Sequence, residues 1–284
     1  MTTAVLAPVH TADAIAELAV GALRAEADLT PKPGLVDRRG TGAHLDMDLD
    51  TLHASAEALG PAFAACASAA RRFPLGPELR ATVGAIGRTG ESDMLAATGG
   101  VNTHRGALWA LGLLSAGAAV ATDVAGAVDF AARLASIPDP ASSVATLSHG
   151  ADARRRYGVR GAAGEAQQGF PHVRCFALPA LQAARDAGCG EASARLAALL
   201  ALMAHLDDTC LLHRGGADGL RAVQLGARAA IEAGGCNEPQ GRQRFAELDR
   251  LCLDHRLSPG GSGDLLSVTL FLDSLTHAEP SCKL

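Results

Sequence analysis

Residues 106–121 read GALWALGLLSAGAAVA and carry no charged side chain. A helix that crosses a membrane needs about 20 predominantly apolar residues. This stretch is shorter, and glycines and a serine interrupt it. An uncharged helix of this length is typical of a protein core, where apolar side chains face neighbours on every side. The stretch therefore predicts a fully buried helix around which other helices pack.

The sequence on both sides of this stretch favours more helices. Alanine, leucine and arginine dominate while β-branched residues are sparse, a composition with high helix propensity. No long segment alternates apolar and polar residues with a period of two, so no strand is predicted. Helices are predicted at 12–27, 51–71, 77–97, 104–121, 123–136, 174–187, 191–207, 218–233, 239–254 and 264–277. We expect an all-α fold in which residues 1–284 form a single multi-helix domain, with Gly/Pro-rich loops at its active site.

The composition excludes several classes of function. The 284-residue chain has a net charge of −5, and only 3% of its residues are aromatic, so it lacks the basic field and stacking surface of a nucleic-acid-binding protein. Its seven cysteines include no C-x-x-C pair, which favours a reducing compartment. The first residues lack the pattern of a signal peptide. We expect a cytoplasmic protein without a membrane or nucleic-acid partner, and the sequence leaves a homo-oligomer open.

Four acids continue the apolar faces of predicted helices, at or near the helix ends. These acids are Glu26, Glu91, Asp207 and Asp264. A buried carboxylate is costly unless it has a cation, a metal ion or several hydrogen bonds as partner. Glu91 and Asp264 could simply favour a helix N-terminus, but Glu26 and Asp207 lie at C-terminal ends, where the helix dipole disfavours an acid. Inward acids at helix ends predict a Mg²⁺ site, because that ion combines a few carboxylates with phosphate oxygens.

Three loops have the composition of phosphate-binding segments. In TPKPGLVD at 30–37, two prolines stiffen the chain around one of only two lysines, and Gly34 permits a close backbone approach. In TGGVNTHRG at 98–106, Gly-Gly can form a nest of N–H groups, and Asn102 or Thr103 can cap the buried helix. HRGG at 213–216 has similar chemistry. Each loop could also be a plain turn.

Several motifs together resemble the triphosphoribosyl-dephospho-CoA synthase family. The resemblance rests on TPKPGLVD at 30–37, GAHLDMD at 42–48, GESDML at 90–95, ATGGVNTHRG at 97–106, HLDDT at 205–209, HRGG at 213–216 and SPGGSGDLL at 258–266. It runs in order over nearly the whole chain and is closer to the malonate decarboxylase branch than to the citrate lyase branch. It implies an all-α enzyme that joins ATP to 3′-dephospho-CoA through the 2′-hydroxyl, with loss of adenine. A separate transferase would then move the product onto an acyl carrier protein.

The resemblance brings no residue roles with it, so we assign candidates from chemistry. The triphosphate needs cations and backbone donors, for which the candidates are Lys32, Gly34, Gly99, Gly100, Thr103, Arg105, Arg214 and Gly215. The Mg²⁺ ion needs carboxylates, from among Asp37, Asp207, Asp208 and Asp264. The candidates for base and for contact with adenine are Glu26, Glu91, Asn102 and His104, with Asp37 as a further contact to adenine. A closing loop within 138–172 would exclude water.

Other functions stay open at this point. Prenyl-diphosphate synthases also present helix-borne aspartates, but the single Asp-Asp here is followed by Thr-Cys-Leu, so the D-D-x-x-D spacing is missing. A helical ADP-ribosyl hydrolase would release free ribose products after attack by water. A non-enzymatic helical adaptor would not explain inward acids beside Gly-rich loops.

Overall fold

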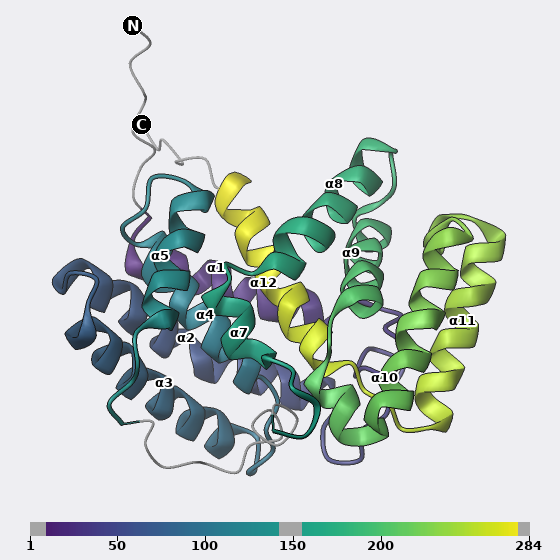
Figure 1. Cartoon of the computed structure of the whole chain (residues 1–284), viewed down its shortest axis with the longest axis horizontal. Coiled ribbons are helices and arrows are strands. Elements are labelled where there is room, and N and C mark those ends of the chain that lie inside the picture. The colour runs from purple at the N-terminus through teal and green to yellow at the C-terminus, as the bar shows by residue number, and fades with distance from the viewer. Residues whose placement is uncertain (1–9, 142–154, 278–284) are drawn as a thin grey trace, which may run out of the picture.

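The computed structural model describes residues 10–141 and 155–277, and its regular structure is helical throughout (Figure 1). Within these ranges no strand forms, so the all-α prediction is confirmed. The helices are α1 (Ala12–Ala27), α2 (Leu49–Arg72), α3 (Pro77–Ala97), α4 (Arg105–Ala118), α5 (Val124–Ser136), α7 (Gly161–Gln167), α8 (Leu178–Asp186), α9 (Glu191–His205), α10 (Thr209–Glu232), α11 (Pro239–Asp254) and α12 (Gly260–His277). A π-helical turn at Val173–Ala177 and a 3₁₀ turn at Gly235–Asn237 complete the set.

The uncharged stretch forms α4, and it lies in the core as predicted. Every residue of α4 from Leu111 to Ala118 is buried. The helix packs against α2, α5 and α12, and α12 crosses the middle of the molecule (Figure 1). Gly117 allows this packing, since a Cβ at that position would lie 2.3 Å from the carbonyl oxygen of Ala127 in α5. One continuous apolar cluster joins residues from α1 through α12, so α4 and α12 form the centre on which the site is built.

Two antiparallel pairs frame this centre. Helices α2 and α3 pack together at one end of the molecule, and α10 and α11 form a hairpin at the other (Figure 1). Helix α9 joins the hairpin to the centre, because it packs on α8, α10 and α12. The loops that precede α4, α10 and α12 meet between the two ends.

Two segments that fall between predicted helices are themselves helical. Residues 209–217 belong to α10, which has a kink at Gly216 (φ 63°), and residues 260–263 form the first turn of α12. Asp208 explains both corrections, since its carboxylate accepts hydrogen bonds from N–H groups at the starts of α10 and α12. Helix starts need such acceptors for their free N–H groups. The glycine content of these segments favours loops. The cap that makes them helical comes from another segment, so the local sequence does not reveal it.

The segment 161–177 also differs from the prediction. It contains α7 and the π-helical turn, whereas a helix was predicted only from residue 174. Residues 142–154, which form part of the predicted closing loop, lie outside the described residues.

A membrane-spanning helix was not expected from the sequence. In the described ranges no single helix is long and apolar enough to span a bilayer, and α9 and α10 meet that requirement only jointly, with a 58° bend between them.

Candidate active site

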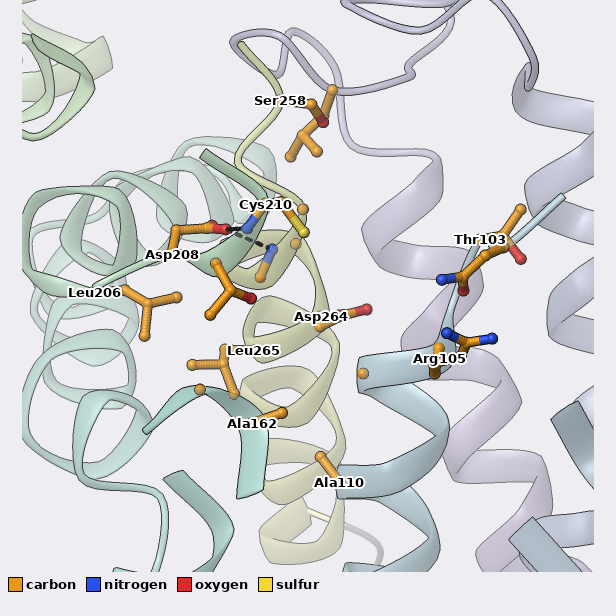
Figure 2. Close-up of a pocket in the computed structure, with 18 of the residues that line it drawn as sticks. Thr103, Arg105, Ala110, Ala162, Leu206, Asp208, Cys210, Ser258, Asp264 and Leu265 are labelled. Carbon is orange, nitrogen blue, oxygen red and sulfur yellow. Dashed lines mark hydrogen bonds between the residues drawn. The ribbon is translucent and has the colours of Figure 1, made fainter. Parts of the chain in front are cut away.

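A cavity of about 900 Å³ lies where the starts of α4, α7, α10 and α12 meet the loop that follows α1. Figure 2 shows side chains from these segments facing a common space, with Thr103 and Arg105 on one wall and Asp208 and Asp264 on another. The predicted site residues that line the cavity are Glu26, Lys32, Asn102, Thr103, Arg105, Asp207, Asp208, Arg214 and Asp264. The structure therefore brings acids and cations from distant helix ends to the lining of one cavity.

Asp208 is a double helix cap at the edge of the cavity. Its Oδ1 accepts from the N–H groups of Cys210 (2.9 Å) and Gly261 (3.2 Å), and its Oδ2 accepts from the N–H (2.8 Å) and Oγ (3.0 Å) of Ser262. Burial raises the pKa of Asp208 although these hydrogen bonds oppose the shift. The carboxylate joins α10 to α12, and this role occupies its oxygens.

Asp264 crosses from α12 to the start of α4. In Figure 2 its carboxylate points away from Asp208 and toward the helix that begins with Arg105. The backbone N–H of Ala107 donates to it, and the absence of a side chain at Gly106 leaves room for it, since a Cβ there would lie 2.1 Å from Oδ2. Burial, with the nearby charges of Glu26 and Asp208, raises the pKa of Asp264 well above its ordinary value. Asp264 thus links α12 to the start of α4, and its surroundings make its charged form less favourable than that of an exposed acid.

Glu26 and Lys32 form a buried ion pair at the back of the cavity. The Lys32 Nζ donates to Glu26 Oε1 at 2.6 Å and to the Glu26 carbonyl oxygen at 2.7 Å. Only 1% of the lysine side chain and 6% of the glutamate side chain are exposed. Of the possible partners for this buried acid, the structure shows a cation, because Lys32 neutralises both the Glu26 carboxylate and the C-terminal end of α1.

Three arginines add positive charge at the more exposed parts of the cavity. They are Arg105, Arg160 and Arg214. Arg105 forms an ion pair with Glu91 of α3, which does not itself line the cavity. Arg214 donates to the carbonyl oxygen of Ala43 (3.3 Å) and to His44 Nδ1 (3.1 Å). The structure thus makes Glu91 a partner of a cavity cation and not a cavity acid.

His104 lies behind the cavity wall and reaches it through two hydroxyl groups. Thr103 lines the cavity, and its Oγ1 lies 2.6 Å from Ser55 Oγ, which lies 2.7 Å from His104 Nδ1. Burial, with the charge of Lys32, lowers the pKa of His104 to about 3. The imidazole is therefore neutral near pH 7, and Ser55, absent from the sequence-based assignments, links it to Thr103.

Besides Glu91 and His104, five predicted residues lie outside the cavity and have structural roles. Asp37 pairs with Arg39, and it accepts from the N–H of Lys32 at 2.7 Å. Glycine is required at Gly34 and Gly215 because a Cβ would approach Leu257 to within 2.2 Å and 2.5 Å. Gly99 and Gly100 have positive φ angles, and the Gly100 N–H donates to Leu95 O, so they end α3 and do not form an anion nest at the cavity.

Comparison with known proteins identifies the family. Residues 12–283 match the family described as CitG: ATP:dephospho-CoA triphosphoribosyl transferase. The chain belongs to this family. A relative from Stutzerimonas stutzeri is 56% identical over 94% of this chain and 93% of its own length. Relatives from Azotobacter vinelandii and Pseudomonas fluorescens are 55% and 53% identical, over 93% of this chain and 92% of their own lengths.

These three relatives are each named probable 2-(5''-triphosphoribosyl)-3'-dephosphocoenzyme-A synthase. No solved structure matches the chain. The cavity of this triphosphoribosyl transferase family member is therefore described from its own residues alone.

The cavity has a charged part and an apolar part. Thr103, Arg105, Asp208 and Asp264 surround the charged part, whereas Ala110, Ala162 and Leu265 lie together at the other end (Figure 2). Trp109, Phe170 and Leu206 add further apolar side chains to the lining of the cavity. The Arg80 guanidinium lies 5.2 Å from the centre of the Trp109 ring. A triphosphate suits the charged part, while a flat base suits an apolar wall that contains an indole.

Sequence reasoning missed several residues that line the cavity. His44 lies 2.7 Å from Ser258 Oγ, and burial and Arg214 lower the pKa of His44. Glu165 of α7 faces the cavity and is held by His172, and this hydrogen bond raises the pKa of His172 against the effect of burial. The sequence contained one signal for Glu165, because this acid follows a Gly-rich stretch. The surrounding segment lacked the helical periodicity needed to predict which way the Glu165 side chain faces.

Proposed function

We propose that this protein transfers the triphosphoribosyl group of ATP to the 2′-hydroxyl of 3′-dephospho-CoA and releases adenine. The observation that carries the proposal is the two-part cavity of about 900 Å³ in a chain that is more than half identical to relatives named for this synthesis. Its charged part suits a triphosphate, and its apolar part suits a purine base. The volume lies near the upper end of the range for small-molecule sites, as two large substrates would require.

The cations of the cavity are assigned to the triphosphate. Lys32, Arg105, Arg160 and Arg214 line the cavity, and a guanidinium can hold phosphate oxygens through two parallel hydrogen bonds. Glu91 positions Arg105 through their ion pair. Asn102 and Thr103 lie beside Arg105 in the wall and offer polar groups to a ribose or a base.

A Mg²⁺ ion fits the acids of this cavity. Among residues 10–141 and 155–277, no group of three His, Cys, Asp or Glu side chains is arranged to hold a metal ion. Mg²⁺ does not need one, because it is commonly held by one or two carboxylates together with substrate phosphates and water. Asp207 and Asp264 fit this role, whereas the oxygens of Asp208 are used in capping helices. A bound Mg²⁺ would reduce the negative charge of the triphosphate.

Charge balance supports a divalent ion. Six carboxylates line the described part of the cavity, against one lysine and three arginines. Side chains alone therefore do not make the cavity positive enough for a nucleotide triphosphate. The acceptance of ATP in such a site is favoured if the nucleotide arrives as its Mg²⁺ complex.

The product is proposed to serve the acyl carrier protein of malonate decarboxylase, after a second transferase has attached it. The motif pattern and chain length support this choice, and citrate lyase is the alternative. The identity of the neighbouring genes would distinguish them, because decarboxylase subunit genes support the first pathway and lyase subunit genes the second.

The test is a product analysis. Purified protein with ATP, Mg²⁺ and 3′-dephospho-CoA should yield adenine and a compound whose mass is the sum of the two substrates minus adenine. A dephospho-CoA analogue without the 2′-hydroxyl should give no joined product. ADP or pyrophosphate as the product would overturn the proposal, and free ribose triphosphate would indicate a hydrolase instead.

A pair of variants tests the site. Arg214→Ala should raise the KM for ATP by about tenfold or more, since a hydrogen bond to a charged group contributes about 1.5–3 kcal/mol. Arg250→Ala, on the exposed face of α11, is the matched control and should leave KM unchanged. Equal KM values for the two variants would remove Arg214 from the binding site.

A further inference from the structure

Glu165 is a buried carboxylate of the cavity that is assigned neither to the triphosphate nor to a metal ion. Glu165 lies on α7, which packs against α4 and α5, and its side chain lines the cavity with Gly161, Ala162 and Ala163. Only 7% of the residue is exposed. A buried carboxylate that faces a substrate cavity needs a partner to hold it there.

His172 is that partner, and it holds both carboxylate oxygens. The backbone N–H of His172 donates to Glu165 Oε1 at 2.9 Å, and Nδ1 lies 2.7 Å from Oε2. The ring is held in turn by Phe176, whose own ring stacks on His205 at 4.0 Å between centroids. Two hydrogen bonds from one residue fix the plane of the carboxylate, and they leave further lone pairs on each oxygen.

The backbone around this pair has two rare features. Phe170 has a positive φ of 55° although it is not glycine, and its buried side chain lines the same cavity. A π-helical turn, Val173–Ala177, follows His172 directly. Such conformations cost free energy and cluster at functional sites. Both features fall within eight residues of the chain, on either side of His172, so they point to a function for this segment.

The better-buried acids in the cavity are already engaged elsewhere. Glu26 is bound by the side-chain amine of Lys32 in a buried ion pair. Asp208 accepts hydrogen bonds from two helix starts. Asp264 accepts from Ala107 at the start of α4.

The two remaining cavity acids, Asp46 and Asp207, are exposed. Exposed carboxylates are solvated and can rotate. As proton acceptors they are therefore less well positioned than a carboxylate that is buried and hydrogen-bonded. Among the described acids of the cavity, only Glu165 is buried and has both carboxylate oxygens held by one residue, His172.

We propose that Glu165 is the general base that accepts the proton of the attacking ribose hydroxyl, and that His172 is the positioning residue that holds it. This inference rests on the proposed function. In the step, the 2′-hydroxyl oxygen of dephospho-CoA forms a bond to the anomeric carbon of the ATP ribose while its proton passes to Glu165. The bond between that carbon and adenine breaks, and its electron pair leaves with adenine, which gains a proton from solvent. Glu165 returns its proton to solvent afterwards, so no net proton is consumed.

The decisive variant is Glu165→Gln. The amide has the size of the carboxylate and still accepts from His172, but it cannot take up the proton. We expect kcat to fall at least about 100-fold, the usual contribution of general base catalysis. The KM values for both substrates should stay within about threefold of the wild type, because binding does not require the proton transfer. Glu247→Gln, at a partly exposed position on α11 outside the cavity, is the matched control and should match the wild type.

A second variant covers the case in which Glu165→Gln is poorly folded. Glu165→Ala leaves space for a small carboxylate, so added formate should restore part of kcat if a base is missing. His172→Asn should lower kcat less than Glu165→Gln does. Formate should not restore the activity of His172→Asn, because the Glu165 carboxylate is still present in that variant. Circular dichroism and Trp109 fluorescence with ATP would report folding and binding independently of turnover.

The outcomes separate this inference from the proposed function. If the wild type makes the joined product and Glu165→Gln retains its kcat, Glu165 is not the base although the function stands. A raised KM with unchanged kcat would make Glu165 a binding residue only and would also overturn the inference. If the wild type releases no adenine from ATP and dephospho-CoA, the proposed function itself fails.

Discussion

The buried imidazole of His104 makes the stability of this protein depend on pH in a way that can be calculated. Only 4% of His104 is exposed, and its pKa is lowered from 6.5 to about 3 by burial and by the charge of Lys32. Between these two values the unfolded chain binds a proton that the folded chain does not. Stability is therefore complete above the unfolded pKa and is lost as the pH falls below it.

The size of the effect follows from the two pKa values. A histidine that titrates at 6.5 when unfolded and at about 3 when folded costs about 2 kcal/mol of unfolding free energy between about pH 7.5 and about pH 5. Because the pKa of His172 is raised, that residue contributes the opposite dependence, so the total slope of the wild type is a mixture. The comparison must therefore be made between the wild type and a variant at His104 alone.

His104→Asn is the suitable variant, because an asparagine amide can replace Nδ1 in the hydrogen bond to Ser55 without titrating. Urea unfolding followed by circular dichroism should show that the variant is less stable than the wild type near neutral pH, because the smaller asparagine side chain leaves a small cavity. The difference between the two proteins should then shrink by about 2 kcal/mol on going to pH 5. Parallel pH curves for the two proteins would show that His104 titrates normally, and the argument for a buried neutral imidazole would fail.

Three further predictions concern other parts of the cavity. Lys32→Met should destabilise the fold by about 3–5 kcal/mol in urea unfolding, because it leaves the Glu26 carboxylate buried and unpaired, and adding Glu26→Gln should recover much of the loss. Asp208→Ala should cost about 2–4 kcal/mol in the same assay, since two helix starts lose a cap, whereas Asp208→Asn should cost less. The emission of Trp109, the single tryptophan, should change when Mg-ATP binds but not with inorganic triphosphate; equal responses would place the base elsewhere.

The sequence predicted the helices best where local signals mark both ends. The predicted range 77–97 coincides with α3, which begins at Pro77 and ends before Gly99 and Gly100. Proline in the first turn and glycine after the last are local signals that do not depend on the rest of the fold. Glycine-rich starts such as that of α12 were missed, because the Asp208 cap that stabilises it lies about 50 residues away in the chain.

The candidate site was predicted in outline, and the functions of individual acids were not. Helical spacing places Glu26 and Asp264 on inward faces, and both line the cavity. Spacing does not show what a carboxylate binds once it is buried. The partner is a lysine for Glu26 and a backbone N–H for Asp264, and only the three-dimensional arrangement distinguishes these cases. Glu165 was not assigned because a positive φ at Phe170 and a π-helical turn break the periodicity on which the prediction relied.

The way in which the acids are used constrains how an anion can be bound. Helices α4, α10 and α12 all begin at the cavity, and a helix start normally attracts phosphate through its free N–H groups. Here Asp208 and Asp264 already accept hydrogen bonds from these starts. Since those N–H groups are occupied by the protein's own carboxylates, we expect a bound triphosphate to depend on side-chain cations and a metal ion. This expectation agrees with the presence of Lys32 and three arginines in the lining of the cavity.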